Sequence, residues 1–325
     1  MTLVIGIDEA GYGPNLGPLV VAASVWRLED DGDAPDPEEA GARLARAAAA
    51  VATAAGLARI PWADSKKLHT PGAGLAPLER GVLAAVGTVG GGRAGPVDGA
   101  GLAERLDIGA DGAPAEWSRF LGTRLPADAD AGDVERLRAA IGSEMPRRGV
   151  ALAALAARVV HPLGFNRLLD DGLNKSDILS RLSLELAAGL RAARSAEPAL
   201  VWCDRHGGRK AYAPLVGRHF DTPLVRTLGE SPEKSRYQVG GPGAAGTWID
   251  FTVGGEERVP VALASMTAKY VRELAMRAFN DHWGALLPGL VPTAGYPVDA
   301  RRWLDAARDT VEAAGLPVGA LWRRA

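Results

Sequence analysis

The chain has 325 residues, of which 47% are hydrophobic and 23% charged, and its formal net charge is −2. This composition is typical of a globular protein with a sizeable core. It gives no global basic signature for nucleic acid, although a local basic groove would suffice to bind one. No apolar run approaches 18 residues and no charged-then-apolar leader opens the chain, so we expect a cytoplasmic protein without a membrane anchor. The single cysteine, Cys203, excludes an internal disulfide and a cysteine zinc cluster.

Two apolar runs, residues 3–7 and 19–23, predict buried strands joined by a glycine-rich turn. The first run ends in two adjacent acids, Asp8 and Glu9. Two carboxylates at the end of a core strand repel each other unless a cation or a proton lies between them. Because Mg²⁺ prefers carboxylate oxygens, the pair predicts half of a metal site. The alternative is an ordinary charged turn.

The next part of the chain is less regular. Helices are expected over residues 38–57 and 75–86. Residues 87–132 are rich in Gly, Ala, Asp and Pro, which predicts irregular structure with little core of its own. The apolar residues at 150–160 fit either a strand or a helix, and Ser176 is placed to cap a helix that ends near residue 193.

Strong patterning returns in the second half of the chain. The expected strands are residues 199–203, 223–227 and 247–253, and the expected helices are residues 259–279 and 299–313. The charged segment 230–237 is expected to be a solvated loop. Strands that come first and then alternate with helices predict an α/β fold with helices on the faces of a sheet.

Further acids follow other expected strands. Asp204 comes directly after residues 199–203, and Glu256 and Glu257 lie between a strand and a helix. Because strand ends in an α/β sheet meet where ligands bind, these acids are expected to converge with Asp8 and Glu9. Such carboxylates could hold one or two divalent cations and support phosphoryl transfer. For each acid alone, the alternative is a solvated turn or a charge favoured at a helix N-terminus.

Five segments, in the same order, resemble the motifs of the type 2 ribonucleases H, the ribonuclease HII family. They are residues 6–14 with 17–18 (GIDEAGYGP and GP), 64–68 (DSKKL), 201–204 (VWCD), 255–260 with 264–269 and 272–273 (GEERVP, ASMTAK and RE), and 295–297 (GYP). The resemblance implies a ribonuclease H-like mixed sheet flanked by helices. It also implies a catalytic domain over residues 1–280, insertion-rich at 27–60 and 70–150, and a C-terminal helical segment over 281–325 that contains the Gly-Tyr-Pro motif.

The resemblance also implies a metal site. Its catalytic residues and ligands would be Asp8, Glu9, Asp204 and Glu256, which together would hold two Mg²⁺ or Mn²⁺ ions, with Asp8 between them. Glu257 is the next choice for the fourth ligand. Glu273 is a more distant choice, because an ordinary helix pair with the lysine four residues before it explains it well.

The implied substrate is a ribonucleotide within a duplex. Gly11, Tyr12 and Gly13 would bring backbone amides to a ribose 2′-hydroxyl. Ser65 and Lys66 would hold a backbone phosphate, and Tyr296 would pack on a sugar. The implied reaction is hydrolysis of the RNA strand of RNA–DNA hybrids, or cleavage at ribonucleotides embedded in DNA, by a protein expected to be a monomer.

Two alternatives stay open. The type 2 ribonucleases H usually have Arg or Lys where this chain has Tyr12, so the first alternative is a nuclease of the same architecture with another nucleic-acid target. The second alternative is a nucleic-acid-binding protein that keeps the fold without catalysis. The segment 206–210 fits a phosphate contact and a solvated turn equally well. Cys203 is expected to lie in the core, facing away from the acids.

Overall fold

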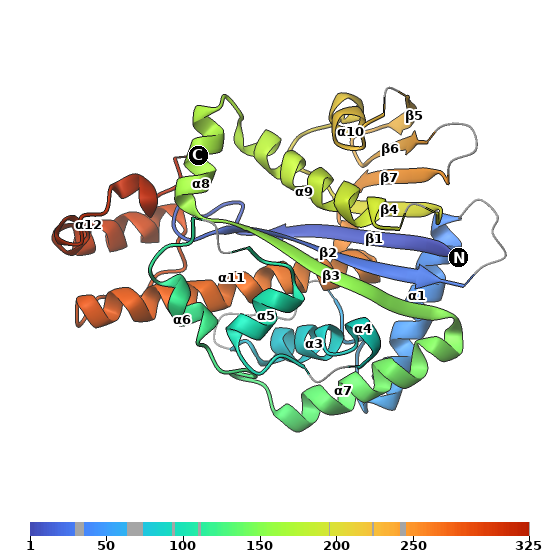
Figure 1. The fold of residues 1–325 in the computed structure, drawn as a ribbon, viewed down its shortest axis with the longest axis horizontal. Coiled ribbons are helices and arrows are strands. Elements are labelled where there is room, and N and C mark those ends of the chain that lie inside the picture. The colour runs from blue at the N-terminus through green and yellow to red at the C-terminus, as the bar shows by residue number, and fades with distance from the viewer. Residues whose placement is uncertain are drawn as a thin grey trace.

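A mixed sheet forms the centre of the computed structural model, which describes residues 1–29, 36–63, 74–92, 95–109, 112–194, 196–222, 224–240 and 245–324 (Figure 1). Its strand order among these residues is β3-β2-β1-β4-β7-β6-β5. The strands are β1 (Thr2–Ala10), β2 (Leu19–Leu28), β3 (Val150–Val160), β4 (Ala199–Asp204), β5 (Val225–Glu230), β6 (Lys234–Val239) and β7 (Thr247–Thr252).

The pairing of the strands determines where the predicted acids lie. β1, β2 and β3 form an antiparallel meander, whereas β4 runs parallel to β1, and β7 runs parallel to β4. β6 and β5 extend the sheet in antiparallel fashion beyond β7. β1, β4 and β7 therefore end at the same edge of the sheet.

Helices cover both faces of the sheet, so the predicted α/β mixed sheet flanked by helices is confirmed. The longer helices are α1 (Pro37–Ala54), α3 (Ala76–Val86), α7 (Ala131–Glu144), α8 (Pro162–Asp170), α9 (Lys175–Ala192), α11 (Val259–Leu286) and α12 (Pro297–Ala313). The shorter ones are α4 (Val89–Gly92), α5 (Gly99–Arg105), α6 (Trp117–Leu121), α10 (Ala213–His219) and the 3₁₀ turns η1 (Pro146–Arg148), η2 (Gly255–Glu257) and η3 (Val318–Ala320). No helix in the described ranges is both long enough and apolar enough to span a membrane.

Alternate residues of each central strand serve two separate cores. Val4 and Trp202 belong to a large cluster with residues of α1, α3, α7 and α11, whereas Ile5 and Val201 pack with α9 and α10 on the opposite face. Because both faces of β1 are covered there, residues 3–7 form a continuous apolar run before the strand reaches Asp8 and Glu9. Figure 1 places α9 and α11 on opposite sides of the sheet.

A third cluster joins α12 to the second half of α11. It contains Trp283 and Trp303, whose rings meet edge to face with centroids 5.6 Å apart. This packing explains why α11 continues to Leu286, beyond the end expected at residue 279. Residue 280 therefore lies inside α11, and the division into 1–280 and 281–325 stays a prediction.

The structure corrects several local expectations. α9 begins at Lys175 and is capped by Asn174 rather than by Ser176, because the Asn174 side chain accepts from the Asp177 amide in a capping box. Residues 150–160 form a strand, and 230–237 include most of β6 rather than a solvated loop.

The region 87–132 also differs from the expectation of irregular structure. Its described residues include the short helices α5 and α6, with Leu102, Trp117 and Phe120 buried in the large cluster. The Trp117 and Phe120 rings stack at 4.1 Å between centroids. This region thus adds to the main core instead of building its own.

Glu79 fastens α3 to the segment that precedes α7. Its fully buried carboxylate accepts hydrogen bonds from the amides of Ala127 (2.7 Å), Asp128 (2.6 Å) and Ala129 (2.6 Å) and from the Tyr270 hydroxyl (2.6 Å). Glu79→Gln would turn an NH₂ group toward these donors, so we expect a loss of about 3 kcal/mol in the free energy of unfolding, measured in urea.

The matched control for this prediction is Glu135→Gln, because Glu135 pairs with Arg138 on the surface. We expect that change to cost less than about 1 kcal/mol. Equal losses in the two variants would contradict the role given to Glu79.

His161 makes the stability of the fold sensitive to acid. Its ring is buried against Trp117, with centroids 4.9 Å apart, and burial lowers the pKa of His161 to about 4. The unfolded chain takes up the proton first, so the contribution of His161 is complete above about pH 6.5 and is lost as the pH falls toward 4. The expected slope is about 1.4 kcal/mol per pH unit.

Unfolding free energies of the wild type and His161→Gln at pH 7 and pH 5 test this expectation. The wild type should lose more stability on acidification than the variant. Equal losses would show that His161 does not titrate as its burial requires.

Candidate active site at the ends of β1 and β4

The register of two parallel strands brings two of the predicted acids side by side. Ile7 of β1 is paired with Cys203 of β4, so the next residues, Asp8 and Asp204, lie at the same level. Neighbouring strands are about 4.8 Å apart, and paired residues point to the same face. Cys203 is buried in the cluster that contains Ile5 and Val201 and packs against α9 and α10, so it lies in the core as the sequence predicts.

Gly6 lets α11 lie directly on this part of the sheet. A Cβ atom at Gly6 would lie 2.2 Å from the carbonyl carbon of Pro260, and the Ser24 hydroxyl donates to the Pro260 carbonyl oxygen at 2.7 Å. Further along the helix, the Ser265 hydroxyl hydrogen-bonds to the Asp8 carboxylate. The first turns of α11 are therefore fixed against the end of β1.

A cavity of about 200 Å³ opens where these elements meet. It brings together all four predicted acids, two residues of the first loop and the tyrosine of the late motif. The lining includes Asp8, Glu9, Asp204, Glu256, Gly11, Tyr12 and Tyr296, with Ser265, Lys269, Arg272 and Glu273 from α11. The third residue of the loop, Gly13, lies at the mouth, where a Cβ atom would be 3.6 Å from the Tyr296 ring.

The two candidates for the fourth acid are placed differently. Glu256 is half-buried and lines the cavity, whereas Glu257 is exposed and points elsewhere. The turn η2 that contains them is joined to β4, because the Gly255 amide donates to Oδ1 of Asp204 at 3.0 Å. This arrangement favours Glu256.

Burial and neighbouring negative charges both act on the acids of the cavity. Burial, followed by the charges of Glu9 and Asp204, holds the pKa of Asp8 well above its usual range, and the Ser265 hydroxyl opposes this rise. A divalent cation would remove the repulsion, and all-oxygen ligands suit Mg²⁺ or Mn²⁺. In the described part of the chain, no group of three or more His, Cys, Asp or Glu side chains is placed to hold a metal ion. The acids thus offer the oxygen donors that such a cation prefers without forming a complete metal site, and the two-metal site stays a prediction.

Two cations on α11 were not assigned roles from the sequence. Lys269 and Arg272 follow Ser265 by four and seven residues, which places all three on one face of the helix. Glu273 lies between them, 3.6 Å from Nζ of Lys269 and 3.8 Å from Nη1 of Arg272. The predicted pair of Glu273 with Lys269 is therefore present. The i, i+4, i+7 spacing of Ser265, Lys269 and Arg272 could have predicted from sequence that both cations lie on the face of the helix that contains Ser265.

Tyr12 has a cation beside it that local sequence does not reveal. Nζ of Lys175, the first residue of α9, lies 4.8 Å from the centroid of the Tyr12 ring. Burial and the charge of Glu9 raise the pKa of Tyr12. A positive charge thus lies next to the first loop although the loop itself has none.

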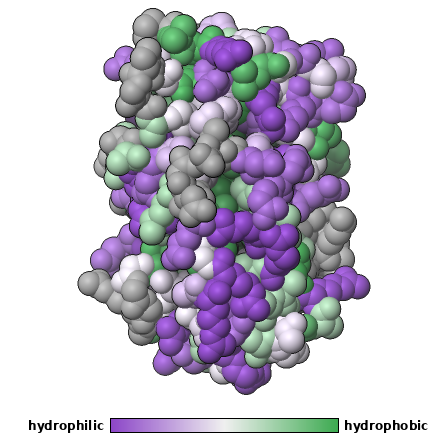
Figure 2. All heavy atoms as spheres, turned by 90° about the vertical axis from the view of Figure 1, so that its right-hand side faces the viewer, coloured by the Kyte–Doolittle hydropathy of each residue, from purple (hydrophilic) through white to green (hydrophobic). Residues whose placement is uncertain are grey.

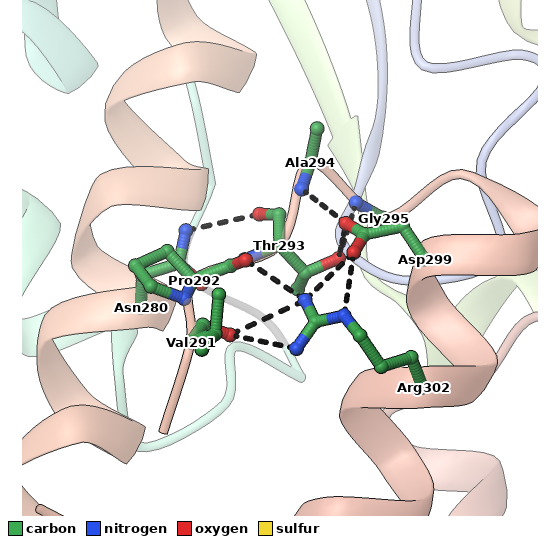
Figure 3. Close-up of polar contacts among 8 residues, drawn as sticks. All are labelled: Asn280, Val291, Pro292, Thr293, Ala294, Gly295, Asp299 and Arg302. Atoms are coloured by element: carbon green, nitrogen blue, oxygen red, sulfur yellow. Dashed lines mark hydrogen bonds and ion pairs between the residues drawn. The ribbon is translucent and has the colours of Figure 1, made fainter. Parts of the chain in front are cut away.

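A network of polar contacts fixes the segment that precedes Tyr296 (Figure 3). The Asn280 amide both donates to the Thr293 carbonyl (3.0 Å) and accepts from the Thr293 amide (2.9 Å). The Thr293 hydroxyl donates to Asp299 at 2.6 Å, and Asp299 in turn accepts from Arg302 at 2.6 Å. Tyr296, which is 55% exposed, therefore projects from a rigid base at the cavity mouth.

Other predicted residues lie elsewhere. Ser65 and Lys66 fall outside the described residues. His206 is buried, with Nδ1 3.0 Å from the Ser180 hydroxyl, and Arg209 forms an ion pair with Asp177. Neither residue lines the cavity, which favours a structural turn for this segment.

The cavity lies at the far end of β1 and β4 from the face in Figure 2, which shows the end of the molecule at which these strands begin. Hydrophilic side chains cover most of that face, and its apolar patches are small and separate. Among the described residues on this face there is therefore no broad apolar patch of the kind that marks a docking surface.

No protein-family model and no curated protein matches the sequence. Among solved structures, a chain of the PCNA–RNase HII complex from Archaeoglobus fulgidus is 15% identical, with 99% of this chain and 94% of that chain covered and a TM-score of 0.43. Ribonuclease H2 from Pyrococcus horikoshii OT3 is 16% identical, with coverages of 99% and 92% and a TM-score of 0.43. Bst-RNase HIII in complex with Mn²⁺ is 16% identical, with coverages of 99% and 66% and a TM-score of 0.41. The alignments with these RNase HII, RNase HIII and ribonuclease H2 structures thus span nearly the whole chain, at low sequence identity.

Proposed function

We propose that this chain is a metal-dependent endonuclease of the type 2 ribonuclease H family. Its substrate would be the RNA strand of RNA–DNA hybrids or a ribonucleotide embedded in duplex DNA. The observation that supports this most strongly is the meeting of Asp8, Glu9, Asp204 and Glu256, from β1, β4 and η2, in one cavity. Mutually repelling carboxylates at the ends of core strands are unfavourable unless a cation uses them.

The carboxylates of Asp8, Glu9, Asp204 and Glu256 would hold two Mg²⁺ or Mn²⁺ ions. When bound, such ions polarise the phosphate and help to generate the attacking hydroxide. Ser265 would orient the Asp8 carboxylate through its hydrogen bond. On the other wall, Lys269 and Arg272 would face the negative charge of the incoming phosphate.

The rest of the cavity fits a sugar and its neighbouring phosphates. Tyr296 offers an exposed ring next to Gly13, and the backbone of Gly11 and Tyr12 is close enough to the acids to contact a 2′-hydroxyl beside the scissile phosphate. Ser65 and Lys66 are proposed to hold a backbone phosphate. Lys175, above the Tyr12 ring, would add positive charge near the loop.

Cleavage of two labelled duplexes tests this function: one has a single embedded ribonucleotide, and the other is a full RNA–DNA hybrid. Each is incubated with Mg²⁺ and with Mn²⁺. Metal-dependent cutting of either duplex is the expected result. Binding of metal without cutting would point to another nucleic-acid target, and absence of both would support a non-catalytic binding protein.

The fourth ligand can be assigned with a matched pair of variants. Because Glu256 lines the cavity and Glu257 does not, Glu256→Gln is expected to lower kcat about a hundredfold, and Glu257→Gln less than about twofold. Steady-state cleavage rates at saturating Mn²⁺ provide the comparison. A reversed order would assign the ligand to Glu257.

A further inference from the structure

Residues 321–324 lie against the loop that follows β1, which we call the glycine loop (residues 11–16). The Arg323 amide donates to the Asn15 carbonyl at 2.8 Å, and Nδ2 of Asn15 donates to the Arg323 carbonyl at 2.9 Å. Leu16 and Trp322 form an antiparallel bridge beside them. The glycine loop is thus paired with a segment from the opposite end of the sequence.

The Arg323 side chain passes beneath the loop and is 1% exposed. Its Nη2 group donates to the Gly11 carbonyl at 2.6 Å and also to the Pro14 carbonyl. Burial, followed by the charge of Arg272, lowers the pKa of Arg323 to about 9, so the guanidinium is still charged at neutral pH. Two carbonyls at the two ends of one short loop therefore share one cation.

The buried charge of Arg323 lowers the stability of the fold. No acid pairs with Arg323 in the described part of the chain, and its Nε and Nη1 groups have no hydrogen-bond partner there. A buried charge without a counter-ion lowers stability. The hydrogen bonds that its side chain makes go to carbonyls of the glycine loop. Its Cζ atom also lies 5.1 Å from the centroid of the Phe165 ring.

Holding the Gly11 carbonyl also orients the next amide. In a trans peptide the N–H points away from the carbonyl oxygen, so the Tyr12 N–H faces away from Arg323. Gly11 and Tyr12 line the cavity, and the Tyr12 amide donates to no described residue. Arg323 thereby leaves this donor available to a ligand.

The backbone on both sides of Arg323 is held by Asn166, a residue of α8. Nδ2 of Asn166 donates to the Gly319 carbonyl at 2.9 Å and to the Trp322 carbonyl at 2.8 Å, and its Oδ1 accepts from the Arg324 amide at 3.0 Å. Asn166 is buried, so these bonds are shielded from water. The segment 319–324 is therefore a rigid support rather than a loose tail.

We propose that Arg323 is a positioning residue, which holds the glycine loop with the Tyr12 amide directed at the substrate. The substrate in question is the ribonucleotide of the proposed function, on which this inference rests. Arg323 would act through the loop and would not touch the reacting atoms.

The test compares Arg323→Lys with Arg324→Lys. Arg324 is an adjacent arginine with an exposed side chain, which contacts Asp170 and the Asn166 carbonyl but not the loop. A lysine at 323 keeps the charge, but its ammonium on a flexible stem lacks the fixed plane in which Nη2 of arginine directs its two N–H groups at the Gly11 and Pro14 carbonyls. We expect Arg323→Lys to raise KM for the ribonucleotide-containing duplex about tenfold with kcat changed less than threefold. Amide hydrogen exchange over residues 11–16 should also become faster, and Arg324→Lys should change neither quantity.

Several results would overturn the proposal. One is an Arg323→Lys variant whose KM and loop exchange match those of Arg324→Lys. If Arg323→Lys does not fold, Arg323→Gln is measured instead, and failure of both to fold would assign Arg323 a purely structural role. If the wild type cuts neither duplex, faster exchange confined to residues 11–16 still supports the positioning role, while the nuclease proposal fails separately.

Discussion

Asp8→Asn is expected to abolish cleavage of both duplexes, with kcat reduced at least about a thousandfold. Asp8 is level with Asp204 across the sheet, adjacent to Glu9 in sequence and hydrogen-bonded to Ser265. Asparagine keeps the shape of the side chain but loses the charge that a divalent cation requires. Single-turnover cleavage in Mg²⁺ and in Mn²⁺ measures the loss.

The same variant should be more stable than the wild type when no divalent cation is present. Since the pKa of Asp8 is raised in the folded protein, its ionised form opposes folding at neutral pH, and removal of the charge should increase the unfolding free energy. Mn²⁺ should raise the Tm of the wild type more than that of the variant. Asp305→Asn, which removes a surface acid paired with Arg308, is the control and should alter neither activity nor metal response. Residual activity above a tenth of the wild-type rate would remove Asp8 from the proposed mechanism.

Gly6→Ala is expected to cost at least about 4 kcal/mol of unfolding free energy. Its Cβ atom would lie 2.2 Å from the carbonyl carbon of Pro260 and 2.4 Å from the nitrogen of Val261, both of which are backbone atoms. β1 and α11 would have to move apart, which would also separate Asp8 from Ser265. Activity should therefore fall together with stability, as measured by urea denaturation and by cleavage of the same duplexes.

Gly41→Ala is the matched control for this prediction. Gly41 lies within α1, and a Cβ atom there would meet nothing within 4 Å. Alanine at this partly exposed helix position should raise stability by up to about 1 kcal/mol. A Gly6→Ala protein as stable as the wild type would mean that α11 does not pack on β1 as described.

The strands that surround the candidate site were readable from sequence because both of their faces are buried. β1 and β4 are continuous apolar runs that end in acids, and such runs need no partner to be recognised. β6 was missed because its outward residues Lys234 and Arg236 are charged. They contact Asp250 of β7, at 3.1 Å and 2.7 Å, and this acid is almost fully buried. The charged residues of β6 are thus explained by their ion pairs with β7. The local sequence pattern does not indicate this pairing.

Local sequence also indicates only part of the candidate site. Its acids could be proposed from sequence, because they lie at the ends of β1 and β4 and in the turn before α11. Lys175 and Arg323 could not, since the first approaches Tyr12 from the start of α9 and the second reaches Gly11 across 312 residues of sequence. Contacts of this kind depend on how α8, α9 and the glycine loop pack, which is a property of the tertiary structure alone.

The parallel pairing of β1 with β4 also has a consequence for folding order. Leu3 is paired with Ala199 and Ile7 with Cys203, so one edge of β1 has no partner until residues 199–204 have been synthesised. β2 follows β1 directly and can cover the other edge early. The backbone groups along that edge of β1 would therefore stay unpaired while most of the chain is being synthesised. An unpaired apolar strand of this kind is prone to aggregation. A ribosome-bound chain that stops before residue 199 should bind chaperones that recognise extended apolar segments, and one that has released β4 should not.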